Sequence, residues 1–377
     1  RCYFRTLDDY MTRVQHIDRP LLILLALLIV GGAAIFTSAA FGLLARGSSH
    51  ISSVVFNHMV LGIGAGTVLL AITASIDYRI WRDWAPHLFI LALIATSLVF
   101  VPFLGFSHGG GRRWIDILGM SFQPSEALKV GGVIMAAAVF SNLKETTASW
   151  TGLAYFGGIC AIPALLLILQ PDMGTLGIVI ASIGVVFLAA GARWRDVALV
   201  GLVGLVMLAI LAFFRPYMLD RVTTFINPGD NPHAEGYQIR QSLIAIGSGE
   251  FFGRGFGQGV QKFTYLPEPM GDSIFAVAAE EVGFVGGSSI IILFLLLALR
   301  GFTIATRVPD MFGALVAVGI STYFVSEAFI NIASMLSLAP LTGVPLTFIS
   351  QGGSAMLISL ASAGILLNIS RRAAHKS

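Results

Sequence analysis

The residue best suited to chemistry in this chain is a carboxylate at the end of its longest polar segment. Residues 215–272 interrupt an otherwise apolar sequence, and their last stretch, YLPEPMGD (Tyr265 to Asp272), leads directly into an apolar run. An ionisable side chain at the edge of an apolar layer is costly to keep there and is a functional candidate by default. We therefore predict that Asp272 is the catalytic residue.

Two further charges lie close together inside a predicted apolar helix. Glu126 and Lys129, in QPSEALK, are three residues apart, so they share a helix face and can neutralise each other. We expect this pair to line a polar cavity. The alternative is an ion pair that only ties helices together, and Glu327 in a later helix presents the same choice.

The helix that follows Asp272 carries two adjacent carboxylates, Glu280 and Glu281. Eight residues correspond to about 800° of helical rotation, so Glu280 points in roughly the direction of Asp272, and Glu281 points farther round. We predict Glu280 as a cavity residue and give Glu281 a weaker claim.

Polar residues also stand at predicted helix ends. Gln123 and Ser125 flank Pro124, which suits a first helical turn, and Asp172 follows Pro171 in QPDMGT. We predict Gln123, Ser125 and Asp172 as substrate-binding or cavity residues, with helix capping as the alternative for Ser125 and Asp172. Ser350 has the same predicted role, within PLTGVPLTFISQGGS (Pro340 to Ser354), where prolines and glycines predict broken helix or re-entrant backbone that is either buried in protein or lines a cavity.

The elements that must position these side chains are membrane helices. With 56% hydrophobic and 11% charged residues, the chain cannot hide its apolar surface in one soluble core. Apolar runs long enough to cross about 30 Å of hydrocarbon recur along it and show no period of two, so we predict an all-α polytopic protein and not a barrel. The ten predicted spans are 20–45, 54–76, 84–105, 124–142, 151–170, 174–192, 196–214, 272–299, 311–337 and 349–370.

An even number of spans puts both termini on one side of the membrane. Fourteen basic residues fall on that side and eight on the other, five of them in the long loop that the positive-inside rule discounts. Both termini are therefore predicted to be cytoplasmic. The predicted organisation is a cytoplasmic tail (1–19), a membrane domain (20–370) with a large external loop (215–271), and a second cytoplasmic tail (371–377).

Several other chemistries lack a pattern in the sequence. The seven histidines show no spacing such as HExxH, and with two cysteines there is no zinc-type ligand set. GFGQG follows no strand and has no GK[ST], so nucleotide binding is not predicted. The net charge of +3 comes without a dense basic run, so no nucleic-acid partner is expected. No organic cofactor is expected either.

Taken together, QPSEALK, QPDMGT, the block from GYQIRQ to AAEEVG and PLTGVPLTFISQGGS resemble the SEDS family, the shape, elongation, division and sporulation proteins. Gln261, Lys262 and Tyr265 before LPE are more similar to its division branch (FtsW) than to its elongation branch (RodA). Departures from the family pattern include Met270 and Gly271 before the retained aspartate, and Thr347 and Gln351 in the last motif.

The resemblance implies a peptidoglycan glycosyltransferase of the bacterial cytoplasmic (inner) membrane, with its active site on the external face. It implies polymerisation of lipid II onto a growing glycan strand beside a class B penicillin-binding protein (an FtsI-like transpeptidase) and other division proteins. It also places the essential aspartate at Asp272 and puts Glu126 and Lys129 in the central cavity. Asp272 would then be the general base, with undecaprenyl pyrophosphate as the leaving group.

The leaving pyrophosphate needs positive charge. Arg221, Arg240 and Lys262 are the candidates in the external loop, with Glu268 of the LPE motif also expected at the substrate site and a divalent cation, Mg²⁺ or Mn²⁺, able to bridge phosphate oxygens. The alternative for the basic residues is contact with lipid headgroups. Two rival functions stay open: a lipid II flippase, which would use the same intramembrane charges, and a division scaffold without chemistry.

Overall fold

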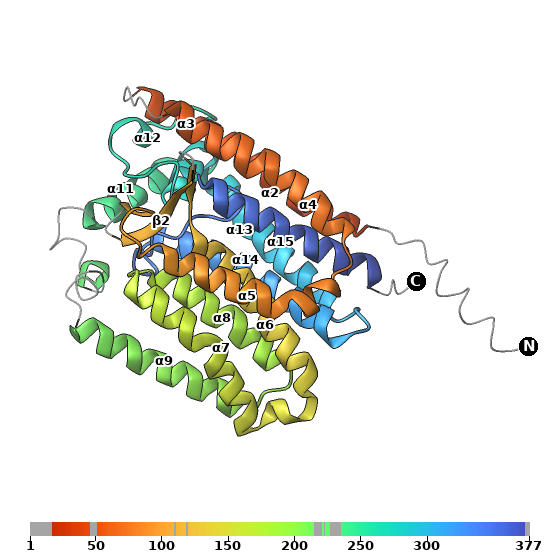
Figure 1. Cartoon of the computed structure of the whole chain (residues 1–377). Coiled ribbons are helices and arrows are strands. Elements are labelled where there is room, and N and C mark those ends of the chain that lie inside the picture. Colours follow the sequence, from red (N-terminus) through yellow and green to blue (C-terminus); the bar gives the residue numbers. More distant parts are fainter. Residues whose placement is uncertain are drawn as a thin grey trace, which may run out of the picture.

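The computed structural model describes residues 17–45, 51–108, 111–117, 120–214, 221, 223–226 and 235–373. Helices occupy each of the ten predicted spans (Figure 1). In chain order they are α2 (Arg19–Ala45), the continuous segment α3 (Ile51–Phe56), η1 (Asn57–Ala65) and α4 (Gly66–Ser75), then α5 (Ile80–Leu98), α6 (Pro124–Leu143), α7 (Trp150–Leu169), α8 (Met173–Ala189), α9 (Trp194–Phe214), α13 (Ile274–Ala305), α14 (Met311–Met335) and α15 (Gly353–Arg372).

Length and composition mark these helices as membrane spans. Among the described residues, seven helical segments are long and apolar enough to cross a membrane, and α8 is apolar but has only 17 residues. The all-α polytopic fold expected from the hydropathy pattern is confirmed.

The third predicted span is wrong at its C-terminal end. We expected helix over 84–105, whereas α5 ends at Leu98 and the chain turns before Pro102, which has no backbone N–H for a continuing helix. A small antiparallel sheet follows, in the order β1 (Gly105–His108), β2 (Gly111–Ile117) and β3 (Met120–Phe122). The sequence pattern did not predict these strands.

The centre of the bundle is formed by α6, α14 and α15, whose apolar windows are 67%, 67% and 78% buried, against 33% for α2, α7 and α13. Small residues allow the central helices to approach closely. A Cβ on Gly319 of α14, for example, would lie 2.3 Å from the side chain of Val133 of α6. The peripheral helices keep apolar side chains exposed on their outer faces, as expected for contact with lipid.

The helix that follows Asp272 is broken one third of the way along. Gly283 has φ +67° and ψ −167°, a conformation that side chains with a Cβ rarely adopt. The loop before the helix pairs with the break: Arg254 and Gly255 donate backbone N–H groups to the carbonyls of Glu280 and Glu281 at 3.0 Å each. This glycine-rich loop (residues 249–259) is therefore built onto α13, because it satisfies backbone groups that the break leaves open.

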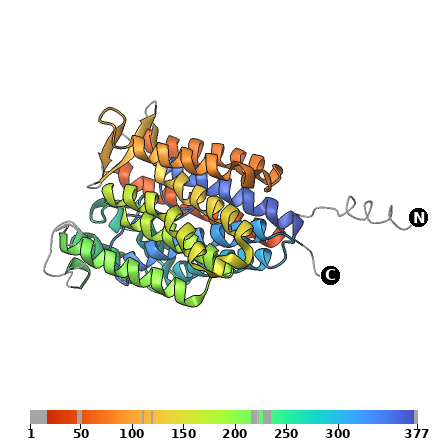
Figure 2. The ribbon, with the colours of Figure 1, turned by 60° about the horizontal axis from the view of Figure 1, so that its bottom comes forward.

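The two ends of the bundle differ. Figures 1 and 2 show the small sheet at one end, and the start of α2 and the end of α15 together at the other. Two short helices of the predicted external loop, α11 (Glu235–Ser248) and α12 (Gln261–Thr264), lie at the sheet end. At the opposite end Arg300 pairs with Asp18 at 2.6 Å, and Arg372 pairs with Asp77 at 2.7 Å.

Candidate active site

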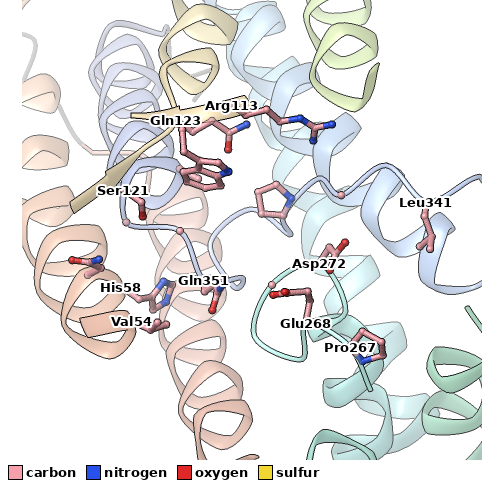
Figure 3. Close-up of a pocket in the computed structure, with 18 of the residues that line it drawn as sticks. Val54, His58, Arg113, Ser121, Gln123, Pro267, Glu268, Asp272, Leu341 and Gln351 are labelled. Carbon is pink, nitrogen blue, oxygen red and sulfur yellow. The ribbon is translucent and has the colours of Figure 1, made fainter. Parts of the chain in front are cut away.

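A cavity of about 480 Å³ opens at the sheet end of the bundle (Figure 3). Six parts of the chain that are distant in sequence meet around it: the α3–η1 segment, the sheet, the residue that precedes α6, Arg221 with α11, the loop before α13, and the irregular segment between α14 and α15. Its lining includes His58, Arg113, Gln123, Arg221, Gln238, Glu268, Asp272, Gly343 and Gln351.

Asp272 stands in the wall of this cavity, two residues before α13 begins. Gln238 of α11 donates from Nε2 to its Oδ1 at 3.2 Å and to the hydroxyl of Ser273 at 3.0 Å. Asn331 of α14 donates from Nδ2 to the backbone carbonyl of Asp272 at 2.8 Å. Side chain and backbone are thus held by two different helices, which fixes the direction of the carboxylate.

A tight turn brings a second carboxylate to the same wall. Glu268 adopts φ +44°, and its backbone carbonyl accepts from the N–H groups of Gly271 at 3.0 Å and Ser273 at 3.3 Å. Figure 3 shows Glu268 beside Asp272, both on the cavity side of this turn. The turn therefore makes a pair of neighbouring acids from residues four apart.

The surroundings of Asp272 change its acidity. Burial, and then the negative charge of Glu268, raise the pKa of the Asp272 carboxyl to about 6, against the donated hydrogen bond from Gln238 and the positive charge of Arg221, which lower it. A carboxylate with a pKa near 6 is still mostly ionised at neutral pH and accepts a proton more readily than an ordinary aspartate. Such a group is suited to general base catalysis.

Two arginines face the acids. Arg221 lines the cavity, as does Arg113 of β2. A Cβ on Gly343 would lie 4.0 Å from Asp272 Oδ2 and 4.0 Å from Arg113 Nη1, so the space above this glycine lies between the acid and the guanidinium. A group seated there would meet a carboxylate on one side and a guanidinium on the other.

Arg113 is positioned by the start of α8. Its guanidinium donates to the backbone carbonyls of Gln170, at 3.3 Å, and Pro171, and forms an ion pair with Asp172 at 3.8 Å. Asp172 is also the N-cap of α8, accepting from Thr175 N at 3.3 Å. The capping alternative for Asp172 is therefore present in the structure, together with an indirect link to the cavity through Arg113.

The other polar residues predicted at the site, Gln123, Ser125 and Ser350, divide between the cavity wall and the protein interior. Gln123 lines the cavity and donates to Ser125 Oγ at 3.1 Å and to Asp172 Oδ2 at 3.4 Å. Ser125 is buried behind it and is not among the lining residues. Ser350 is also buried, accepting from Leu346 N and donating to the carbonyl of Gly271, both at 2.7 Å. It ties the irregular segment before α15 to the loop that carries Asp272.

Glu126 and Lys129 lie deeper in the bundle than the cavity lining. Lys129 Nζ is 2.8 Å from a carboxylate oxygen of Glu126 and 2.8 Å from one of Glu327, and all three side chains are 1% exposed. A separate void of about 10 Å³, the size of one water molecule, adjoins Glu327. The three charges form a buried triad between α6 and α14, which matches the helix-tying alternative.

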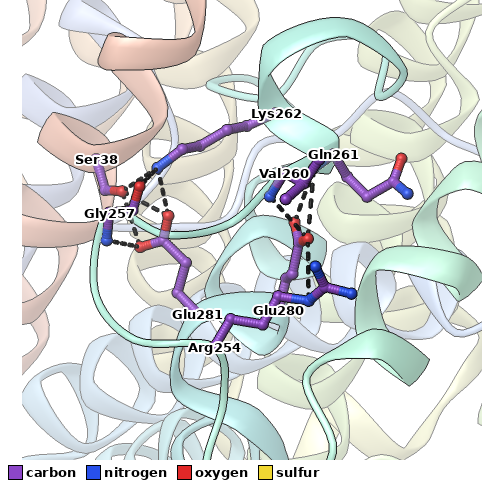
Figure 4. A network of polar contacts seen from close by, with 8 residues as sticks. All are labelled: Ser38, Arg254, Gly257, Val260, Gln261, Lys262, Glu280 and Glu281. Atoms are coloured by element: carbon purple, nitrogen blue, oxygen red, sulfur yellow. Dashed lines mark hydrogen bonds and ion pairs between the residues drawn. The ribbon is translucent and has the colours of Figure 1, made fainter.

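Lys262, Glu280 and Glu281 form a second buried network, which anchors the glycine-rich loop (Figure 4). Lys262 Nζ is 2.5 Å from Glu281 Oε1, and Glu281 Oε2 accepts from Gly257 N at 3.0 Å. Glu280 accepts from the backbone N–H of Val260 at 2.8 Å. None of these three charged residues lines the cavity, and neither does Arg240, which is exposed on α11.

Four residues of this site were not predicted from the sequence. Arg113 was visible in HGGGRRWID, but only the sheet turns it towards the cavity. Gln238 and Asn331 are uncharged, so the cost of a buried charge does not single them out, although an asparagine in an apolar helix is also costly to bury. The fourth is His58 of η1, a single histidine without a metal-ligand spacing.

The comparisons with known proteins agree with the architecture. Residues 19–375 match the model of the cell cycle protein family of FtsW, RodA and SpoVE. Stage V sporulation protein E of Bacillus subtilis (strain 168) is 36% identical over 362 residues, covering 96% of this chain and 99% of that protein. A probable peptidoglycan glycosyltransferase FtsW of Geobacter sp. (strain M18) is 36% identical over 363 residues, covering 96% and 99%. The peptidoglycan glycosyltransferase MrdB of Escherichia coli (strain K12) is 34% identical over 361 residues, covering 94% and 93%.

Solved structures share the fold. A chain from a peptidoglycan synthase complex, described as coordinating polymerisation and crosslinking, superposes with a TM-score of 0.75 at 26% identity, covering 94% of this chain and 98% of that one. The rod shape determining protein RodA of Thermus thermophilus gives 0.69 at 26% identity, covering 94% and 97%. Sporulation, division and MrdB relatives stand at 34–36% identity, so overall identity does not separate the branches.

Proposed function

The chain belongs to the FtsW, RodA and SpoVE family of cell cycle proteins, and we propose that it is a peptidoglycan glycosyltransferase in which Asp272 is the general base. Family membership and the names of the relatives support the activity. The observation that supports the assignment of the base is the position of Asp272: a carboxylate of raised pKa in the wall of the cavity, held by Gln238 and Asn331 and faced by arginines.

In the proposed reaction, Asp272 takes the proton from the 4-hydroxyl of the acceptor's N-acetylglucosamine. The freed oxygen attacks the anomeric carbon of the donor's N-acetylmuramic acid, and the bond from that carbon to the pyrophosphate oxygen breaks. Attack from the opposite face inverts the carbon and gives a β-1,4 link. Undecaprenyl pyrophosphate leaves with the bonding electron pair.

The developing charge on the pyrophosphate needs cations in a site shielded from water. Arg113 and Arg221 line the cavity and take this role, in place of Arg240 and Lys262, which do not line it. A divalent cation, Mg²⁺ or Mn²⁺, would be held by the carboxylate of Glu268 in the cavity wall, because magnesium commonly binds one or two carboxylates together with substrate phosphates. Since no cluster of three or more His, Cys, Asp or Glu side chains occurs in the described ranges, the pyrophosphate would complete its ligand set. Bound there, the cation would neutralise charge on the leaving group.

We place the protein in the bacterial cytoplasmic membrane with the cavity on the external face, as the distribution of basic residues predicts. A class B penicillin-binding protein is the proposed partner, supported by the complex to which one structural neighbour belongs. The motif around Gln261, Lys262 and Tyr265 supports the division branch.

The decisive experiment gives labelled lipid II to the purified protein with a class B partner and separates the products by size. Wild type should make glycan polymer, and Asp272→Ala should make none while it elutes and melts like a folded protein. Asp83→Asn, an exposed carboxylate in the first turn of α5, is the matched control and should polymerise normally. Normal polymer from the Asp272→Ala protein would overturn the base. A wild type that only moves lipid II across liposome membranes would favour the flippase, and one that does neither would favour the scaffold.

A further inference from the structure

His58 is a buried imidazole without a partner at the edge of the cavity. It is 1% exposed, and neither ring nitrogen has a hydrogen-bond partner in the described part of the chain. Its ring stacks on Phe36 of α2 with centroids 3.8 Å apart and planes at 23°. An unsatisfied buried polar group costs roughly 1–3 kcal/mol. If its only role were to pack against Phe36, a histidine at this position would be less stable than an apolar ring.

The backbone around His58 is also unusual. Asn57–Ala65 is a π-helical stretch within the span, and π-helical insertions occur frequently at functional sites because they change the direction of neighbouring side chains. Here Val54, Asn57 and His58 all line the cavity. The segment is pressed onto the start of α15, where a Cβ on Gly353 would lie 2.8 Å from the carbonyl oxygen of Asn57. Tight packing therefore holds the backbone next to His58 against the start of α15.

The cavity has two chemically different ends. Arg113, Arg221, Glu268 and Asp272 carry its charges, whereas Asn57, His58, Ser121 and Gln351 offer uncharged hydrogen-bonding groups. Figure 3 shows Gln351 beside His58, on the side towards Glu268 and Asp272. His58 and Gln351 line the same cavity, and the Gln351 side chain is partly exposed.

We propose that His58 and Gln351 form a carbohydrate subsite, in which the imidazole and the amide hydrogen-bond an uncharged polar group of the sugar, a hydroxyl or an acetamido group. A buried imidazole with no carboxylate partner is neutral, and it then has one donor and one acceptor, as a hydroxyl does. A pyrophosphate would instead favour the arginine end of the cavity. The subsite deepens the proposed glycosyltransferase function and depends on it for the identity of the sugar.

The test measures binding without turnover. Proteins carrying Asp272→Asn in nanodiscs are titrated with lipid II and, separately, with undecaprenyl pyrophosphate, and the complexes are counted by native mass spectrometry. His58→Phe keeps the ring stack on Phe36 and removes both nitrogens. We expect it to weaken lipid II binding about 3- to 10-fold, the range of one or two net hydrogen bonds, and to leave undecaprenyl pyrophosphate binding unchanged.

Gln351→Ala is a second variant at a partly exposed position, so the core does not have to repack around it. It should weaken the binding of lipid II in the same way. His58→Gln restores a neutral donor and acceptor and should recover part of the affinity. Thr73→Val removes a buried hydroxyl farther along the same span and is the matched control, with no effect on either ligand. In the active protein, His58→Phe should raise KM more than it lowers kcat and leave the pH midpoint in place.

Equal weakening of both ligands, or of neither, would overturn the subsite. The result can be read even if the proposed function fails. A wild type that binds lipid II but makes no polymer would reject the glycosyltransferase, while the difference between the two ligands would still report on His58 and Gln351.

Discussion

Asn331 Nδ2 lies 2.8 Å from the backbone carbonyl of Asp272 and, with the same amide group, 2.8 Å from the carbonyl of Val344. One buried asparagine of α14 therefore joins the loop that carries the acid to the irregular segment before α15. Both segments lack regular hydrogen bonding of their own at this point, so the asparagine supplies it. The position of the carboxylate depends on this link as much as on α13.

Replacement of Asn331 by leucine, which is similar in size and cannot donate, should release this link. We expect kcat to fall about 10- to 100-fold, because the variant would displace the proposed general base and a small displacement of such a group is costly to the rate. KM should change much less. The measurement is the rate of lipid II polymerisation over a range of substrate concentrations that reaches saturation.

Asn368→Leu is the matched control for Asn331→Leu. Asn368 is also buried, but it holds the carbonyl of Ala74 and the N–H of Tyr78, in the turn that follows α4. It should lower the melting temperature and leave kcat of the folded fraction intact. Equal loss of kcat in both variants would show that Asn331 acts only through general stability.

The acidic limb of the pH–rate profile should report Asp272. Since its pKa is raised to about 6 and the base must be ionised, kcat/KM should fall as pH drops through about 6. Two variants should move this midpoint in opposite directions. Glu268→Gln removes a nearby negative charge and should lower it, and Gln238→Leu removes a hydrogen bond to the carboxylate and should raise it. A midpoint that stays the same in both would assign the limb to another group.

The bundle could be predicted from hydropathy because lipid demands long apolar helices, and each of the ten spans is helical. The short sheet could not, because its strands are 4, 7 and 3 residues long and depend on pairing with each other. The break at Gly283 could not be predicted either, because it depends on pairing with another segment of the chain. A glycine in an apolar run shows no sign of the loop that packs against it.

For the site, the cost of a charge near the membrane identified Asp272, but not its uncharged partners Gln238 and Asn331. Asp272, Arg221, Glu268 and Gln123 were predicted at the substrate site and do line the cavity. Lys262 and Glu280 are also charges that are costly to bury, yet in the structure they anchor a loop. In the sequence, a buried charge that holds the backbone cannot be distinguished from one that binds a substrate. Only the three-dimensional arrangement separates the two uses.

We expect the charge balance within the buried triad of Glu126, Lys129 and Glu327 to determine the stability of the folded protein. Lys129→Met leaves the carboxylates of Glu126 and Glu327 facing each other without a cation, and breaking a buried ion pair in this way costs about 3–5 kcal/mol. The variant should unfold at a clearly lower temperature in detergent. In contrast, the triple variant Glu126→Gln, Lys129→Met, Glu327→Gln removes all three charges and should recover most of the loss. A triple variant as unstable as the single one would mean that the charges contribute more than their mutual neutralisation.

Loss of the negative charge of Asp272 should stabilise the protein, and the effect should depend on pH. The pKa of Asp272 is about 6 in the folded protein against an ordinary value of 3.8, so the folded state binds this proton more tightly than the unfolded state does. The stability contributed by protonation is therefore complete below about pH 4 and is lost as pH rises through about 6. Because the side chain is partly exposed to the cavity, the loss should be on the order of 1–2 kcal/mol.

Asp272→Asn has no charge to bury, so its melting temperature should exceed that of wild type at pH 8, and the difference should disappear near pH 4. A difference that is the same at both pH values would show that the carboxylate is not held in a buried environment beside Glu268.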